Sequence, residues 1–197
     1  MDKRALQAAD WGLFGGLGAL FVLSQVGLNR GNLVEPAPVW MLMVNILLLS
    51  VPLALLYGSI ALLVIAKRQL RAGALDGRLA KWVYWAPRVA GILIILFVSL
   101  FALDSFEQGR SLWHMLGAFA MHMLPSLGLA TCLALAWRRE WLGFWAFLLA
   151  AAGFFVLTVS GGRSMYLPGN LLLFVGPLLA IALLFRLNWR LRTHPVG

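Results

Sequence analysis

The sequence is poor in charge, in acidic residues and in cysteine. Only 12% of its 197 residues are Asp, Glu, Lys or Arg, whereas soluble globular domains usually carry about 25%. The single cysteine, Cys132, excludes an intramolecular disulfide. The sequence patterns of zinc proteases, P-loops, nucleophile elbows and EF-hands are all missing. These absences exclude a soluble domain, and we expect no enzymatic activity, no metal and no cofactor.

Hydrophobic residues make up 62% of the chain and give a mean hydropathy of +0.88. A helix that crosses the hydrocarbon core of a bilayer needs about 20 apolar residues. Six apolar runs of suitable length occur, at approximately 11–28, 38–66, 83–103, 111–137, 141–160 and 170–185. The sequence therefore predicts an all-α fold, a polytopic membrane helix bundle with six transmembrane helices.

The second run is unusually long, and Pro52 lies near its middle. Two helices in this run would have about 14 residues each, fewer than the roughly 17 that a crossing requires. We therefore expect one long, tilted helix with a bend at the proline.

Sixteen Lys and Arg residues outnumber seven Asp and Glu residues, and they are unevenly distributed. If six helices cross the membrane in turn and the N-terminus is cytoplasmic, all basic residues except Arg30, Arg110 and Arg163 lie on the cytoplasmic side. Since Lys and Arg accumulate in cytoplasmic segments, both termini are predicted to be cytoplasmic. Attraction of anionic lipids accounts for the basic surface without a nucleic-acid partner.

Charge and hydropathy divide the chain into three parts. Residues 1–66 are predicted to form an N-terminal two-helix transmembrane hairpin, and residues 67–81 a basic cytoplasmic loop. Residues 82–197 are predicted to form a four-helix transmembrane module.

The first apolar run also has the outline of a secretory signal peptide, because Lys3 and Arg4 precede it. However, Asp10 is unusual before such a run, and the small-residue cleavage pattern is missing. The glycines of the run are more typical of a closely packing helix surface: Gly12, Gly15, Gly16 and Gly18. We expect a retained helix, whereas cleavage of residues 1–27 would leave five helices.

The fourth run contains two ionisable side chains, His114 and His122. Such groups are costly inside a bilayer and often functional. At helical spacing the two histidines share a face with Pro125 and Ser126, and we expect this face to point into the bundle. Pro125 also leaves the carbonyl of Met121 without its usual hydrogen bond. These residues form a candidate intramembrane polar site, for a proton relay or a haem or pigment ligand, with a purely structural role for His122 left open.

Two further sets of charged residues are candidates. Asp104 and Glu107 form an outer acidic cluster, either a cation site or an interfacial ion-pair network. Arg88 lies inside the third run, and Glu140 lies in the short hairpin between the fourth and fifth runs. Because an arginine at that depth needs a partner, we expect Arg88 to pair with Glu140, or to bind the carbonyl end of the fourth helix.

The segment from residue 88 to about residue 189 contains a series of short motifs. They are Arg88-Val-Ala-Gly91-Ile, Ser99-Leu-Phe-Ala-Leu-Asp104-Ser-Phe106 with Gly109, His122-Met-Leu-Pro125, Trp137-Arg-Arg-Glu140-Trp-Leu-Gly143, Gly176-Pro177 and Asn188-Trp189. Through them the chain resembles an uncharacterised family of small, four-span bacterial integral membrane proteins. The resemblance implies a four-helix module in a bacterial inner (plasma) membrane and no known activity. The first two runs lie outside it, and Arg139 stands where an aromatic residue would be expected.

Several functions remain compatible with the sequence. We favour a non-enzymatic accessory, assembly or scaffold component that acts through helix–helix contacts, with another membrane protein or a second copy as partner. One alternative is a small proton-coupled transporter or channel centred on His122. Another is a haem- or pigment-binding membrane subunit with the same histidine as ligand.

Overall fold

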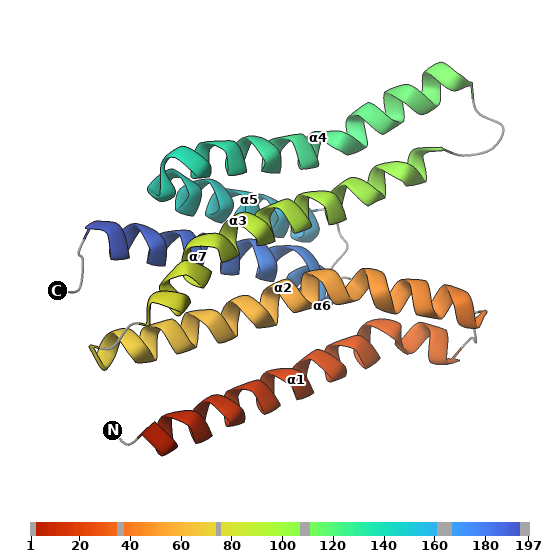
Figure 1. Ribbon diagram of the computed structural model, residues 1–197. Helices are drawn as coiled ribbons and strands as arrows, with labels where there is room; N and C mark the ends of the chain where they lie inside the picture. Colours follow the sequence, from red (N-terminus) through yellow and green to blue (C-terminus); the bar gives the residue numbers. More distant parts are fainter. Residues whose placement is uncertain (1–2, 35–37, 74–75, 107–110, 161–166, 194–197) are drawn as a thin grey trace.

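The computed structural model describes residues 3–34, 38–73, 76–106, 111–160 and 167–193. Within these residues the chain forms helices and no strand, arranged as an elongated bundle (Figure 1). The elements are α1 (Lys3–Val34), α2 (Val39–Arg71), α3 (Gly77–Leu100), the 3-10 turn η1 (Phe101–Ser105), α4 (Leu112–Arg138), α5 (Glu140–Ser160), α6 (Leu167–Asn170), the π turn η3 (Leu171–Val175) and α7 (Gly176–Thr193). Six stretches of the described chain are long and apolar enough to cross a membrane, which confirms the predicted all-α bundle of six such helices.

The second apolar run forms one helix, as predicted. Helix α2 passes through Pro52 without a break and contains 33 residues. At a rise of about 1.5 Å per residue it is about 50 Å long, more than the roughly 30 Å of a hydrocarbon core. Beyond it lies Gly73, whose positive φ of 65° is a conformation that glycine adopts without strain.

Most of the predicted basic loop at 67–81 is helical, which corrects the boundaries expected from charge alone. Helix α2 continues to Arg71, and α3 already begins at Gly77. The side chain of Asp76 accepts a hydrogen bond of 3.3 Å from the backbone N–H of Arg78 and thereby caps α3. Because Lys and Arg are good helix formers, both helices extend past their apolar runs.

The last apolar run is interrupted by the π turn η3. In this turn the N–H of Gly176 bonds to the carbonyl of Leu171. Pro177 follows directly, and a proline lacks an N–H and clashes with the carbonyl four residues before it. The wider π turn accommodates this proline. A Cβ at position 176 would lie 2.9 Å from the carbonyl oxygen of Leu171, so only glycine fits there without a shift.

Helix α7 packs against α2, α3 and α5 and forms the centre of the bundle. Its Phe185 stacks on Phe147 of α5, with ring centroids 5.7 Å apart. A Cβ added to Gly143 of α5 would lie 2.6 Å from the Cβ of Ala136 and 3.0 Å from Phe185. This glycine therefore allows α4, α5 and α7 to approach one another closely.

Helix α1 packs chiefly against α2, and polar contacts recur along the hairpin. From the start of α1 they join Asp10 with Arg68 (3.1 Å), Ser24 with Tyr57 (2.7 Å), Gln25 with Ser50 (2.8 Å) and Asn29 with Asn45 (3.1 Å). Such hydrogen bonds hold helices together in a bilayer, where little water competes for them. Only 6% of the apolar window of α1 is buried inside the bundle, so most of its surface faces outward.

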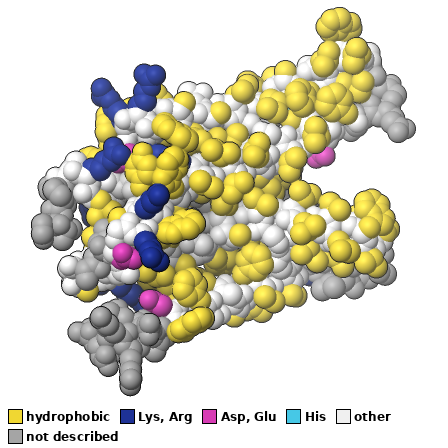
Figure 2. Space-filling model, in the orientation of Figure 1, with side chains coloured by type: hydrophobic (Ala, Val, Ile, Leu, Met, Phe, Trp, Pro, Cys, Tyr) yellow, Lys and Arg dark blue, Asp and Glu magenta, His cyan; other side chains and the backbone are white. Residues whose placement is uncertain are grey.

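Both described ends of the chain, Lys3 and Thr193, lie at the same end of the bundle (Figure 1). Lys and Arg side chains gather there on the face shown in Figure 2, and we call this the basic end. It is formed by the starts of α1, α3 and α5 and by the ends of α2, α4 and α7. At the opposite end, α3 and α4 stand apart from α1 and α2 (Figures 1 and 2).

Candidate functional site

The structure brings Arg88 of α3 and Glu140 of α5 together inside the bundle. The guanidinium Nη2 of Arg88 donates to Oε1 of Glu140 at 3.0 Å, and its Nη1 donates to the carbonyl of Tyr84. The two charged side chains are only 1% and 5% exposed. The pairing predicted from the sequence is therefore present, and it is almost completely withdrawn from the surroundings of the bundle.

Aromatic rings surround the buried guanidinium. The Arg88 guanidinium carbon lies 3.8 Å from the ring centroid of Tyr84 and 5.7 and 5.9 Å from those of Phe185 and Trp137. A cation above an aromatic face is stabilised by the ring's quadrupole, by about 2 kcal/mol when water is excluded. The rings thus offset part of the cost of burying the charge, while Glu140 neutralises it.

Helix α7 completes this group of residues. The side-chain amide of Asn188 donates to the carbonyl of Val83 on α3 at 2.8 Å. The Nε of Arg192 lies 3.5 Å from the same Glu140 oxygen that Arg88 contacts, but Arg192 is 62% exposed. We call Tyr84, Arg88, Glu140, Asn188 and Arg192 the Arg88 cluster. It joins α3, α5 and α7 at the basic end.

Sequence reasoning identified the ion pair of this cluster but not its other members. Asn188 carried a signal, because it is a neutral polar residue beside an apolar run and belongs to the motif Asn188-Trp189. No feature of the sequence pointed to Arg192, because basic residues are expected in any cytoplasmic segment that follows a transmembrane helix. Among the described residues, Nε of Arg88 has no hydrogen-bond partner, so the cluster leaves one buried donor unsatisfied.

Helix α4 buries the predicted face only along its second half. His114, His122 and Pro125 are exposed, although periodicity predicted that they point into the bundle. The buried residues of α4 are Ser126, Leu129, Leu133 and Ala136. All of these lie in its second half, since within the described chain the first half runs mainly beside η1 and the end of α3 (Figure 1). Periodicity reveals which residues share a face, but not how far along a helix its neighbours extend.

Local hydrogen bonds hold the His122 ring. Its Nδ1 lies 2.8 Å from the carbonyl oxygen of Ala118 and 3.2 Å from Oγ of Ser105 on η1. Because a carbonyl only accepts, Nδ1 is the donor in the first contact. The contact with Ser105, which the sequence did not suggest, links η1 to α4.

The predicted intramembrane polar site is not assembled as one site. His122 and Pro125 border a groove of about 310 Å³. The remaining walls of this groove are apolar: Val98, Phe101, Met121, Phe154 and Phe174. Ser126 does not line it; its side chain is buried, and its hydroxyl has no hydrogen-bond partner among the described residues. His114 is exposed two turns earlier, about 12 Å away along the helix.

Of the two residues of the predicted outer acidic cluster, the structure describes one. Asp104 is exposed on η1, and Glu107 lies outside the described residues. In the described ranges, no three His, Cys, Asp or Glu side chains lie close enough together to hold a metal ion.

Comparison with known proteins identifies the family of the chain. No curated protein and no solved structure gives a significant match. A family model described as a domain of unknown function (DUF7670) matches residues 76–196. This range begins at the residue that caps α3 and contains Arg88, Glu140 and Asn188, the buried members that join three helices. Because the match spans more than half of its length, the chain belongs to the DUF7670 family.

Proposed function

We propose that this protein is a non-enzymatic component of a bacterial inner membrane, with both ends cytoplasmic. It serves as an accessory, assembly or scaffold subunit and acts through helix–helix contacts. The observation that carries this proposal is an unpacked glycine face on α1.

The glycine face is directed away from α2. At about 100° per residue, Gly12, Gly15 and Gly16 occupy an arc of about 100° on α1. A Cβ added to any of them would meet no atom within 4 Å. Asp10 and Ser24, which contact α2, lie on the opposite side of the helix. The face is therefore open, and the polar contacts with α2 hold it in a fixed orientation.

Three glycines in one helix face need an explanation. Glycine lowers helix stability by about 1 kcal/mol relative to alanine, and it offers lipid no more contact than a larger side chain would. Between membrane helices, small residues let the backbones approach closely and gain van der Waals contact. A partner helix against this face accounts for the glycines, whereas lipid does not.

The first test is the state of the protein in a mild detergent. The full chain is purified, and its mass is measured by size-exclusion chromatography with light scattering corrected for bound detergent. We expect a homo-oligomer or a stoichiometric complex with another membrane protein. A strictly monomeric protein without a partner would contradict the proposal.

Two leucine substitutions on α1 test the face itself. Gly16→Leu fills the glycine face, whereas Gly18→Leu adds the same bulk about 160° around the helix. Both positions are open within the bundle, so both variants should fold. We expect Gly16→Leu to dissociate the complex and Gly18→Leu to preserve it. Equal behaviour of the two variants would show that the complex does not use this face.

The alternatives centred on His122 have less support. A proton pathway needs polar groups or water, yet the groove beside His122 has otherwise apolar walls. A haem or pigment would be bound through Nε2, because Nδ1 donates to the carbonyl of Ala118, and this alternative rests on the single histidine alone. Purified protein with a visible absorption band that disappears in His122→Ala would reinstate the pigment alternative.

A further inference from the structure

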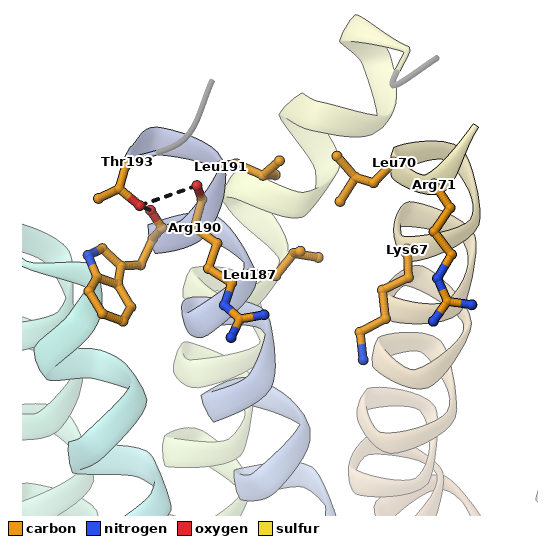
Figure 3. A pocket seen from close by; sticks show the side chains of 8 residues that line it. Lys67, Leu70, Arg71, Leu187, Arg190, Leu191 and Thr193 are labelled. Carbon is orange, nitrogen blue, oxygen red and sulfur yellow. Dashed lines mark hydrogen bonds between the residues drawn. The ribbon is translucent and has the colours of Figure 1, made fainter. Parts of the chain in front are cut away.

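A cationic groove lies at the basic end, between the last turns of α2 and α7 (Figure 3). Its volume is about 770 Å³. Lys67 and Arg71, one turn apart on α2, form one wall, and Arg190 of α7 lies on the other (Figure 3). We call these three residues the groove cations.

The groove cations lack acidic partners. Among the described residues, none of the three forms an ion pair, although their neighbours do. Arg68 pairs with Asp10 at 3.1 Å, and Arg192 contacts Glu140 at 3.5 Å. Like charges one helical turn apart also repel each other. The groove therefore concentrates positive charge that the chain itself does not neutralise, and an anion would relieve this repulsion.

The rest of the groove is mostly apolar. Leu70, Leu187 and Leu191 line it, and Leu187 is buried in the cluster that joins α2, α3 and α7. Trp189 also borders it and is 41% exposed. Tryptophan is enriched where a helix leaves the hydrocarbon region and enters the headgroup region. The groove thus offers cations beside an apolar wall at the depth of lipid headgroups.

We propose that this groove binds the phosphate headgroup of an anionic phospholipid. The groove cations contact the phosphate oxygens, and the leucine side chains contact the first part of the acyl chains. Basic pockets between transmembrane helices provide this combination for lipids with phosphate-containing headgroups. A free phosphate ion would use the cations alone and leave the apolar wall without a role, so the groove favours a lipid.

The test uses the full-length protein in detergent micelles and three probes. Phosphatidylglycerol, phosphatidylcholine with the same acyl chains, and inorganic phosphate are titrated separately, and bound lipid is followed by native mass spectrometry. We expect phosphatidylglycerol to bind at least about tenfold more tightly than phosphatidylcholine, since only the first carries net charge. Inorganic phosphate at millimolar concentration should not displace it.

Charge-matched variants locate the site. Arg71→Gln with Arg190→Gln removes one cation from each wall, and at about fivefold per basic side chain it should weaken phosphatidylglycerol binding about 25-fold. The control, Arg78→Gln with Lys81→Gln, removes the same charge from the same end outside the groove. Because neither control side chain lines the groove and exposed charges are screened at physiological ionic strength, the control should stay within about twofold of wild type. Arg71→Lys with Arg190→Lys keeps the charge and should retain most of the affinity.

Three results would overturn the proposal. One is equal binding of the two lipids, and another is an equal loss in the control and groove variants. The third is displacement of phosphatidylglycerol by inorganic phosphate, which would identify a site for soluble anions. All the substituted side chains are exposed, and unchanged helical circular dichroism would verify that each variant folds.

Discussion

Removal of the Glu140 carboxylate is expected to destabilise the bundle strongly. The guanidinium of Arg88 is 1% exposed, so it cannot turn to water or lipid headgroups when its partner is lost. Removing one member of a buried ion pair costs about 3–5 kcal/mol of folding free energy. Glu140→Gln keeps an oxygen that can accept from Arg88, so we expect a loss of about 3 kcal/mol. Glu140→Leu removes charge and acceptor together and should approach the loss of about 5 kcal/mol.

A double substitution separates the pair from its surroundings. When both charges are replaced by apolar residues, as in Arg88→Met with Glu140→Leu, no uncompensated charge remains, and such replacements are often neutral. We therefore expect the double variant to be more stable than Glu140→Leu alone. Arg192→Gln is the matched control, because an exposed ion pair contributes about 1 kcal/mol or less.

The free energy of unfolding can be measured by reversible unfolding in mixed micelles with a denaturing detergent, followed by tryptophan fluorescence. The reasoning would be refuted if the double variant lost as much folding free energy as the two single variants together, because the two charges would then not stabilise each other. A Glu140→Gln loss no larger than that of Arg192→Gln would also refute it.

Four further substitutions test packing and hydrogen bonding by the same measurement. Gly143→Ala should cost about 1–3 kcal/mol, because its methyl group would collide with the Cβ of Ala136 and with the ring of Phe185. Gly153→Ala on the same helix meets nothing within 4 Å and should be stabilising by up to about 1 kcal/mol, so equal effects would contradict this packing. Gln25→Leu should cost about 0.6–1.7 kcal/mol by removing side-chain bonds to α2, and no loss would mean that they do not hold the hairpin together. His122→Ala should cost about 1 kcal/mol, and a much larger loss would assign the ring more than its local hydrogen bonds.

The number and order of the helices could be predicted because hydropathy sums over about 20 residues, and single exceptions matter little. Pro52 illustrates this: the length of its run outweighed the helix-breaking tendency of one residue, and α2 is continuous. The Arg88–Glu140 contact could be predicted because an arginine at that depth has few possible partners and the short hairpin fixed the neighbouring helices.

The surroundings of His122 could not be predicted in the same way. Helical periodicity correctly grouped it with Pro125, but the burial of that group depends on where α3 and α5 lie along α4. The sequence pattern also did not predict the π turn before Pro177. A π turn shifts the backbone hydrogen bonds by one residue, and this shift leaves the hydropathy of the segment unchanged. Tertiary position decides the burial around His122, and a single sequence carries little information about it.

The Arg88 cluster ties α3, α5 and α7 together at the basic end, and its effect on motion differs from its effect on stability. In the described chain, the polar contacts nearer the opposite end join pairs of elements, such as Asn170 with Thr158 and Ser105 with His122. A bundle fastened across three helices at one end behaves like a hinge with its pivot there. Helix movements should therefore grow in amplitude with distance from Glu140, and spin-label distance distributions should broaden towards the far ends of α3 and α4.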